Sequence, residues 1–148
     1  MENSQWPWRL SEQAQEKLQA KTQVISVPAG AMIFKEGKTS DMVFKVLRGQ
    51  IKVYKKTSSG QEVALYFIEQ GQVCPLALQS CLFWKPAMAS AVATAETELA
   101  CIPAADFAQM LTIQEDALND ILNFVGDSLK AIEQAFRSVS QNRSNKLN

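Results

Sequence analysis

Regularly spaced glycines divide the middle of the chain into short apolar segments, and this pattern limits the fold more than any other feature. Gly30, Gly37, Gly49, Gly60 and Gly71 follow one another at intervals of 7, 12, 11 and 11 residues. Turn residues spaced about 8–12 apart are typical of all-β sandwiches and barrels. The spacing therefore predicts short antiparallel strands in this region.

The segments between these glycines have the composition of strands. Residues that favour strands are concentrated in 24–27, 32–34, 42–47, 51–54 and 63–68. The last two segments flank Ser58-Ser59-Gly60, which predicts a hairpin. Residues 91–94 and 99–102 supply two more strands. We expect a mainly β domain with the strand pattern of a roll.

Helices are predicted on both sides of the β domain. Ser11 can cap a first helix over residues 12–20, whose few apolar residues place it on the surface. Thr112 and Glu115 have the spacing of a capping box, in which each side chain bonds a free backbone N–H at a helix start. A long helix is therefore expected from about Ile113.

This long helix carries a continuous heptad seam. Its members are spaced 4, 3, 4, 3 and 4 residues apart: Leu118, Leu122, Val125, Leu129, Ile132 and Phe136. Such spacing is typical of a helix that pairs with another helix, so we predict a homodimer interface here. The alternative is that the seam packs only on the chain's own β core. Gly126 costs about 1 kcal/mol relative to Ala in a helix, which a close helix crossing near Val125 would explain.

The sequence after Arg137 is polar and has no periodicity, so the helix is expected to fray there. The predicted organisation is an N-terminal helical segment (1–22), a β-roll (23–111), a dimerisation helix (112–138) and a polar tail (139–148).

Composition disfavours several classes of chemistry. Histidine is absent, which removes the commonest general base and metal ligand. Cys74, Cys81 and Cys101 lack the spacing of a zinc site, and no phosphate-binding glycine loop of a nucleotide enzyme occurs. We predict that the chain is not an enzyme and holds no metal.

Charge and hydropathy indicate the cellular setting. Fifteen acidic and fifteen basic residues cancel, so DNA binding by this chain alone is disfavoured. The N-terminus lacks the pattern of a signal peptide, and no apolar run reaches the ~20 residues of a membrane helix. A cytoplasmic location without membrane contact is expected.

Several motifs occur together in the order and spacing of one known family. They include FKEG at Phe34–Gly37, the segment VLRGQIKVYKK, the segment IEQGQ and the segment AETELACIP. Over about Val27 to Phe136 the chain resembles the cyclic-nucleotide-binding domain of the Crp/Fnr family of bacterial transcription regulators. The resemblance implies a double-stranded β-helix, or jelly roll, with flanking helices and a long C-terminal dimerisation helix.

The same resemblance implies that the usual ligand does not bind. Nucleotide-binding members use a glutamate on the ribose and an arginine on the cyclic phosphate. Alignment places Ala87 at the arginine and Pro75-Leu76 at the Gly-Glu step. Loss of both anchors should cost several kcal/mol, and Lys85 cannot replace a guanidinium fork. We therefore predict no physiological binding of cyclic AMP or cyclic GMP.

Three interpretations of the Gly71–Ala93 segment remain open. It can form a collapsed core, which its apolar composition favours, or a site for an unknown small-molecule effector. Candidate pocket residues are Gln72, Cys74, Leu76, Lys85, Ala87 and Ser90. The third interpretation is a thiol redox sensor using Cys74 and Cys81. No cofactor is predicted, because family members with iron–sulfur clusters use an N-terminal cysteine group and those with haem use histidine.

Two functions therefore compete. The first is the effector-sensing and dimerisation domain of a transcription regulator, whose DNA contact would need a helix-turn-helix that is not found after Phe136. The second is a free-standing module that acts by protein–protein contact. Its contact face would be the basic hairpin at Lys52, Lys55 and Lys56, or Trp6 and Trp8. We favour the first, because it explains both the β-roll and the heptad seam.

Overall fold

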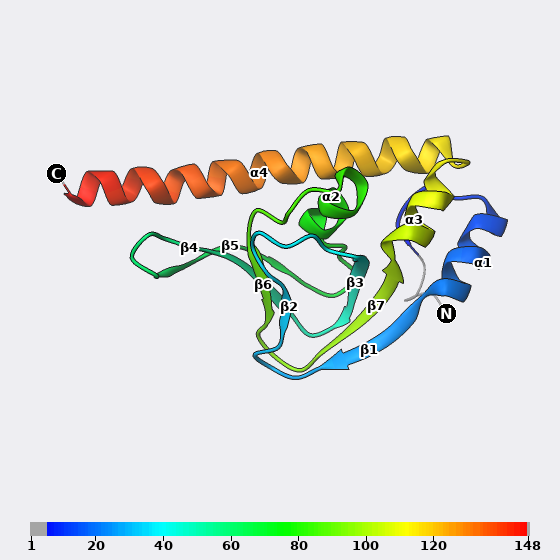
Figure 1. Cartoon of the computed structure of the whole chain (residues 1–148), viewed down its shortest axis with the longest axis horizontal. Helices are drawn as coiled ribbons and strands as arrows, with labels where there is room; N and C mark the ends of the chain where they lie inside the picture. The colour runs from blue at the N-terminus through cyan, green and yellow to red at the C-terminus, as the bar shows by residue number, and fades with distance from the viewer. Residues whose placement is uncertain (1–5, 148) are drawn as a thin grey trace.

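Two antiparallel sheets form the centre of the molecule (Figure 1). The computed structural model describes the backbone of residues 6–147 and the side chains of residues 6–137. One sheet has the order β1 (Gln23–Val27), β7 (Thr97–Pro103) and β3 (Met42–Arg48). The other has the order β2 (Met32–Phe34), β6 (Ser90–Ala93), β4 (Ile51–Lys56) and β5 (Glu62–Ile68). The predicted mainly β jelly-roll fold is confirmed.

The hairpin predicted around Gly60 is the clearest match between sequence and structure. Strands β4 and β5 pair from Ile51 opposite Ile68 to Lys56 opposite Glu62, with an irregularity in register after Val53. Gly60 has a φ of +85°, a backbone conformation that glycine adopts without a steric penalty. The chain therefore turns at the position that its glycine marks.

Gly49 is required for a different reason, because it lies against the neighbouring strand. A Cβ atom at this position would lie 2.5 Å from the Thr97 Oγ1 atom and 2.6 Å from the Glu96 carbonyl oxygen. The Thr97 hydroxyl also accepts a hydrogen bond from the backbone N–H of Gln50, at 3.2 Å. Glycine therefore allows the turn between β3 and β4 to pack onto the start of β7.

Over residues 6–147 the sheets are accompanied by four helices: α1 (Glu12–Lys21), α2 (Pro75–Phe83), α3 (Ala104–Leu111) and α4 (Glu115–Leu147). The expected cap of α1 is confirmed, because the Ser11 hydroxyl accepts a hydrogen bond from the backbone N–H of Ala14 at 3.1 Å. Helices α2 and α3 were not predicted from the sequence.

The capping box at Thr112 is a wrong prediction. The Thr112 hydroxyl donates a hydrogen bond to the Gln109 carbonyl oxygen at 2.7 Å, so it closes the C-terminal end of α3. Helix α4 begins at Glu115 and continues as backbone through Leu147, past the fraying expected at Arg137. The Thr112 hydroxyl therefore caps the end of α3 and not the start of α4.

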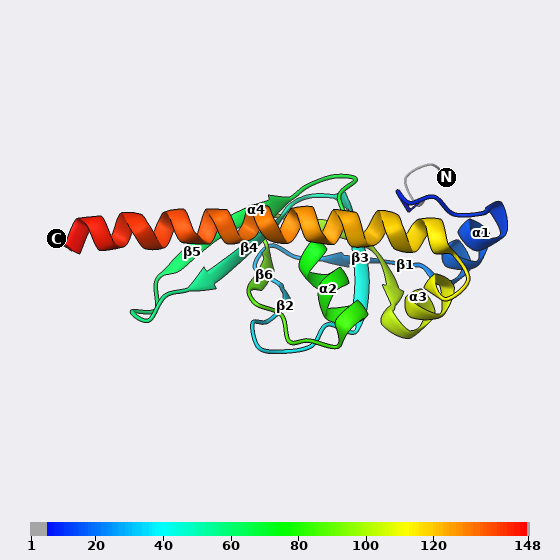
Figure 2. The same cartoon turned by 90° about the horizontal axis from the view of Figure 1, so that it is seen from above.

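The buried side chains form two clusters on either side of β3. The helical cluster contains Trp6, Trp8, Leu18, Val43, Phe107 and Ile121, among others. The roll cluster contains Phe44, Val46, Ile51, Val53, Leu76 and Ala87, among others. Neighbouring residues of β3 supply opposite clusters, as the alternation of a strand requires. Helix α4 contributes residues to both clusters. Its ribbon runs over α2 in two perpendicular views (Figures 1 and 2).

Candidate functional site

The segment that would hold a nucleotide is closed by core packing. Helix α2 starts with Pro75 in its first turn, a position where the missing backbone N–H costs nothing. Leu76 has no exposed surface and Ala87 is 4% exposed, and both belong to the roll cluster together with Cys74. The structure therefore brings three of the six candidate pocket residues together, as core contacts.

The backbone around Ala87 is also occupied by the protein itself. The N–H of Ala87 donates to the Lys38 carbonyl, and the N–H of Gly37 donates to the Ala87 carbonyl, both at 2.9 Å. Ser90 is buried and its hydroxyl accepts from the backbone N–H of Glu36 at 2.9 Å. These bonds hold the loop before β3 against Ala87 and Ser90. The backbone N–H of Ala87 is therefore not free to bind an anion.

The two remaining candidate pocket residues lie at the surface. Lys85 is exposed, outside the packed interior. Gln72 is exposed too, and its Oε1 atom accepts a hydrogen bond from the backbone N–H of Glu69 at 2.8 Å. The packing favours the collapsed-core interpretation of the Gly71–Ala93 segment, called the cassette below, over a ligand site within it.

Burial makes the cysteines poor thiolates. Cys74, Cys81 and Cys101 are free and buried, and burial raises the pKa of each thiol from 9.0 to about 11. The thiolate is the form that reacts with oxidants, so a raised pKa lowers reactivity at neutral pH. This environment argues against the thiol-sensor interpretation.

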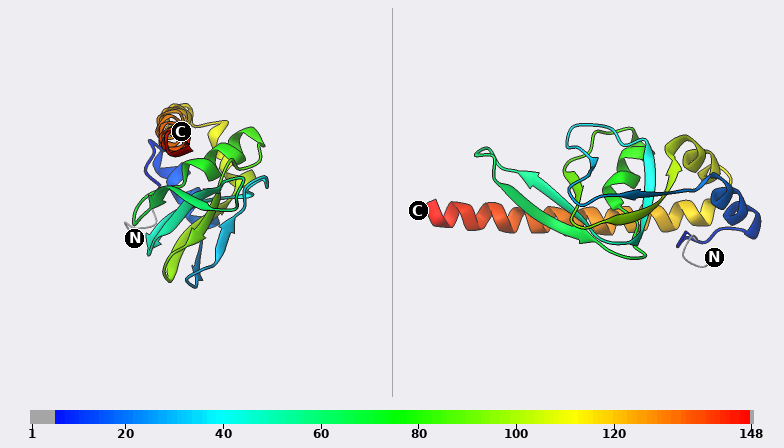
Figure 3. Two further views of the ribbon diagram at one scale, coloured as in Figure 1. Left: turned by 90° about the vertical axis from the view of Figure 1, so that its left-hand side faces the viewer. Right: turned by 90° about the horizontal axis from the view of Figure 1, so that it is seen from below.

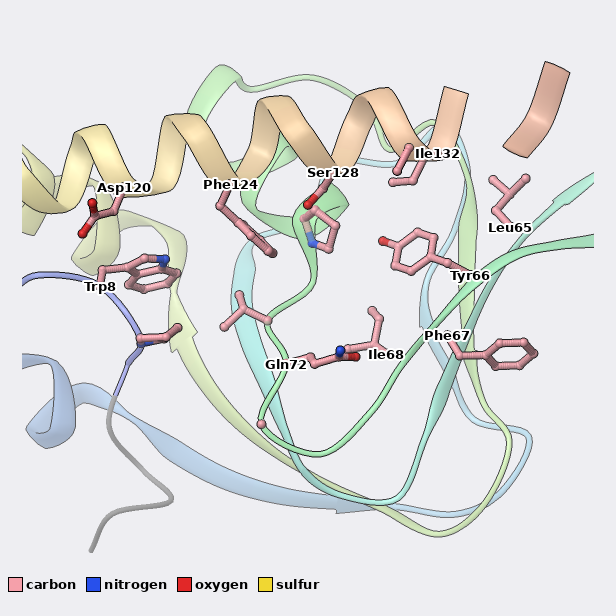
Figure 4. Close-up of a pocket in the computed structure, with 15 residues that line it drawn as sticks. Trp8, Leu65, Tyr66, Phe67, Ile68, Gln72, Asp120, Phe124, Ser128 and Ile132 are labelled. Carbon is pink, nitrogen blue, oxygen red and sulfur yellow. The ribbon is translucent and has the colours of Figure 1, made fainter. Parts of the chain in front are cut away.

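A groove that the sequence did not reveal lies between α4 and β5 (Figure 4). It has a volume of about 580 Å³, and its walls come from the N-terminal segment, β5, residues 71–73 with Pro75, and α4. Phe124 of α4 lies outside the heptad seam and is 36% exposed. An apolar residue off the seam was the one signal in the sequence that could have indicated this groove.

An ion pair joins the N-terminal segment to α4 at one end of this groove. The Arg9 guanidinium donates to both carboxylate oxygens of Asp120, and its backbone N–H donates to the same side chain, at 2.9–3.1 Å. The side-chain hydrogen bond with Arg9 lowers the pKa of Asp120 and raises that of Arg9. The carboxylate is therefore charged and already paired at neutral pH.

The residues considered as a protein-contact face take part in the fold. Trp6 and Trp8 are buried and stack on each other with ring centroids 5.5 Å apart. Lys52 pairs with Glu62 at 3.3 Å, and Lys55 pairs with Glu36 at 3.4 Å. Lys56 is the one residue of this set that is exposed. These contacts give the tryptophans and two lysines structural roles.

The heptad seam of α4 is divided between the core and the surface. Val125 and Ile132 are 3% and 6% exposed and pack within the chain, in the helical and roll clusters respectively. Leu118, Leu129 and Phe136 are half-buried, and Leu122 is 42% exposed. An end-on view shows α4 resting on one side of the rest of the molecule, with its outer side uncovered (Figure 3).

Neither a membrane-spanning helix nor a metal-binding cluster occurs in the described part of the chain. Over residues 6–147 the structure has no helix both long and apolar enough to cross a bilayer. The described part of the chain likewise contains no group of three or more Cys, Asp or Glu side chains that could hold a metal ion.

Solved structures with the same fold are numerous. The sensor domain of the transcriptional regulator DNR from Pseudomonas aeruginosa aligns with a TM-score of 0.70 and 21% identity, covering 81% of this chain and 79% of that one. FixK2 from Bradyrhizobium japonicum aligns with a TM-score of 0.67 and 17% identity, covering 76% and 55%. The catabolite activator protein of Thermus thermophilus gives 0.61 and 20%, covering 93% and 57%.

This chain thus spans little more than half the length of the last two proteins. No curated protein matches its sequence. The family described as cyclic nucleotide-binding domain matches residues 24–114, which include both sheets apart from one residue of β1, and also α2 and α3. The chain therefore belongs to the cyclic nucleotide-binding domain family.

Proposed function

We propose that the chain is the effector-sensing and dimerisation domain of a Crp/Fnr-like transcription regulator that does not bind cyclic nucleotides. Within that regulator it acts in the cytoplasm, and DNA is contacted by a separate helix-turn-helix. The observation that carries the proposal is the packed cassette, where Leu76 and Ala87 lie in the roll cluster.

Electrostatics explain why a packed cassette excludes the nucleotide. A cyclic phosphate is an anion, and moving it out of water requires a charged or hydrogen-bonding partner. Ala87 has no side-chain donor, and its backbone N–H is bonded to the Lys38 carbonyl. Lys45 is buried, but its ammonium group lies 5.9 Å from the Trp6 ring centroid, among residues of the helical cluster. The roll interior therefore offers an anion no cation from these positions.

Helix α4 supplies the route from the sensing domain to a second subunit. Its inner residues Val125 and Ile132 contact the two buried clusters, while Leu122 lies on its uncovered side. A change in how the domain packs on the inner face would tilt or shift the outer face. In a dimer, that shift changes the geometry of the helix pair, which is a common form of switching between two states.

Calorimetric titration tests the proposal directly. We expect no saturable heat when cyclic AMP or cyclic GMP is added to the chain up to millimolar concentration. The matched control ligand is 5′-AMP, which has the same base and sugar as cyclic AMP without the cyclic phosphate. Saturable heat with either cyclic nucleotide and none with 5′-AMP would refute the proposal, because it would require a functioning phosphate site.

A further inference from the structure

Two segments that are far apart in sequence meet along one edge of the molecule. One spans residues 83–88 at the end of α2, and the other spans residues 35–41 between β2 and β3 (Figure 2). The Ser80 hydroxyl joins them, because it donates to the Lys85 carbonyl at 2.6 Å and accepts from the backbone N–H of Ser40 at 2.8 Å. The backbone hydrogen bonds described above add further links. We call these two segments together the loop surface.

The loop surface carries three large apolar side chains that are exposed, those of Phe83, Trp84 and Met88. Trp84 is 70% exposed, which is the highest value among the large apolar residues that the structure describes. Tryptophan is well buried on average in soluble proteins, and apolar residues that are exposed together often mark a site of interaction. The loop surface is therefore a candidate contact site.

The backbone at Trp84 indicates that this exposure has a function. Trp84 follows the last residue of α2 with a φ of +54° and a ψ of +39°, a left-handed conformation that bulky residues rarely adopt. It is the one non-glycine residue with a positive φ in the described part of the chain. Glycine usually occupies this position after a helix, because it has no Cβ atom to cause strain. A strained backbone that presents an exposed indole ring is typical of a functional position.

The charged side chains of the loop surface give it a net positive charge. Lys35, Lys38 and Lys85 are exposed, and none of them forms an ion pair with a described residue. Of the two acidic residues in the same segments, Glu36 pairs with Lys55 of β4 at 3.4 Å. The unpaired lysines therefore outnumber the unpaired acidic groups, and the charge complements an anionic partner.

Both the form and the charge of the loop surface favour a lipid bilayer as that partner. A peptide usually adds a strand to a sheet edge or lies in a groove. Trp84 instead projects from the end of a helix, and it is not among the described residues that line the groove between α4 and β5. Tryptophan prefers the interface between lipid headgroups and acyl chains, and lysines are attracted to anionic headgroups.

From these features we propose that the loop surface binds the surface of a membrane that contains anionic lipids. Phe83 and Trp84 enter the interface between headgroups and acyl chains, while the lysines contact lipid phosphates. The prediction of no membrane contact rested on the lack of a long apolar run in the sequence, and a peripheral contact needs no such run. The contact is independent of an effector and of dimerisation through α4.

Vesicle flotation tests the chemistry of the partner. The full chain should bind vesicles made of equal amounts of phosphatidylcholine and phosphatidylglycerol, and should bind vesicles of phosphatidylcholine alone at least tenfold more weakly. Added salt should weaken binding to the anionic vesicles, because it screens the lysines. No binding to the anionic vesicles, or equal binding to both kinds, would overturn the proposal.

The variant Trp84→Gly tests the role of the indole. It removes the ring and relieves the strained backbone, so binding to the anionic vesicles should weaken at least tenfold while the urea denaturation midpoint stays the same or rises. A merely structural role would lower that midpoint. The control is Ile113→Gly, which removes another exposed apolar side chain and should leave binding unchanged. Binding by Trp84→Gly as tight as that of wild type would favour a protein partner and overturn the proposal.

Reversal of charge tests the role of the lysines. The double variant Lys38→Glu/Lys85→Glu should weaken binding to the anionic vesicles at least tenfold. The double variant Lys17→Glu/Lys21→Glu changes the net charge of the chain equally, at exposed positions on α1, and should change binding less than twofold. Equal losses in the two variants would show attraction by net charge alone and would overturn the assignment to the loop surface.

Discussion

Ala87 is the single residue that best shows that the cassette is part of the buried core. Its side chain is 4% exposed, and its N–H and carbonyl are both hydrogen-bonded to the loop at 37–38. The sequence alignment predicted the loss of the arginine, because that required comparing a single position. It could not show that the space is filled, because the filling side chains come from several strands and from α2.

Ala87→Arg should therefore destabilise the protein. The substitution places a guanidinium group in the roll cluster without a carboxylate partner, and we expect a loss of about 3 kcal/mol or more. Met88→Arg is the matched control, because Met88 is 43% exposed and its substitution should change stability by less than about 0.5 kcal/mol. Urea denaturation measures both. An Ala87→Arg variant as stable as wild type would show that the cassette is open.

The buried cysteines should also make the stability of the fold depend on pH, which is again an effect of single residues. Burial raises the thiol pKa values from 9.0 to about 11, so the unfolded chain loses these protons at lower pH than the folded one. The thiol contribution to stability is intact below pH 9 and should be lost as pH rises from about 9 to 11. Denaturation midpoints of wild type and Cys74→Ala measure the effect, which should be smaller in the variant. Equal pH dependence in the two proteins would contradict the assignment to Cys74.

At the scale of elements, strands were easier to predict than helices. The glycines mark turns that the backbone needs, and the hairpin at Gly60 follows directly from residues near one another in sequence. Helix α2 was missed because its residues are buried on nearly every side, so it has no amphipathic pattern to detect. The start of α4 was misplaced because Thr112 bonds a carbonyl of α3.

The groove was beyond sequence analysis for a geometric reason. Trp8, Tyr66 and Phe124 are far apart in the chain, and only the packing of α4 on β5 brings them to one space. The heptad seam predicted a homodimer interface, with packing on the chain's own β core as the alternative, and the structure divides the seam between buried Val125 and exposed Leu122. The paired partner remains a proposal.

Replacing Gly126 of α4 by alanine should stabilise the fold of a monomeric variant but weaken dimerisation of the otherwise native chain. It is exposed, and a Cβ at this position would meet no atom of the chain within 4 Å. In the Leu122→Asp background, Gly126→Ala should stabilise the fold by about 0.5–1 kcal/mol through helix propensity. In the otherwise native chain it should weaken dimerisation if helices cross closely there. The control is Lys130→Ala, which should change neither quantity appreciably. Stronger dimerisation by Gly126→Ala would rule out a close crossing.

The whole molecule consists of a β-roll with a filled interior and a helix that touches both of its buried clusters. Val125 and Ile132 join α4 to those clusters, and the Arg9–Asp120 pair joins it to the N-terminal segment. These contacts connect both the roll and the N-terminal segment to α4. This arrangement transmits a signal only if the uncovered side of α4 meets a second subunit.

Sedimentation equilibrium is the most direct test of that claim, because it measures self-association of the chain itself. We expect a dimer at tens of micromolar, conversion to a folded monomer by Leu122→Asp, and retention of the dimer by Asn123→Asp, which places the same charge one residue further along the helix. A wild-type chain that stays monomeric at several hundred micromolar, or a Leu122→Asp variant that dimerises like wild type, would contradict the account.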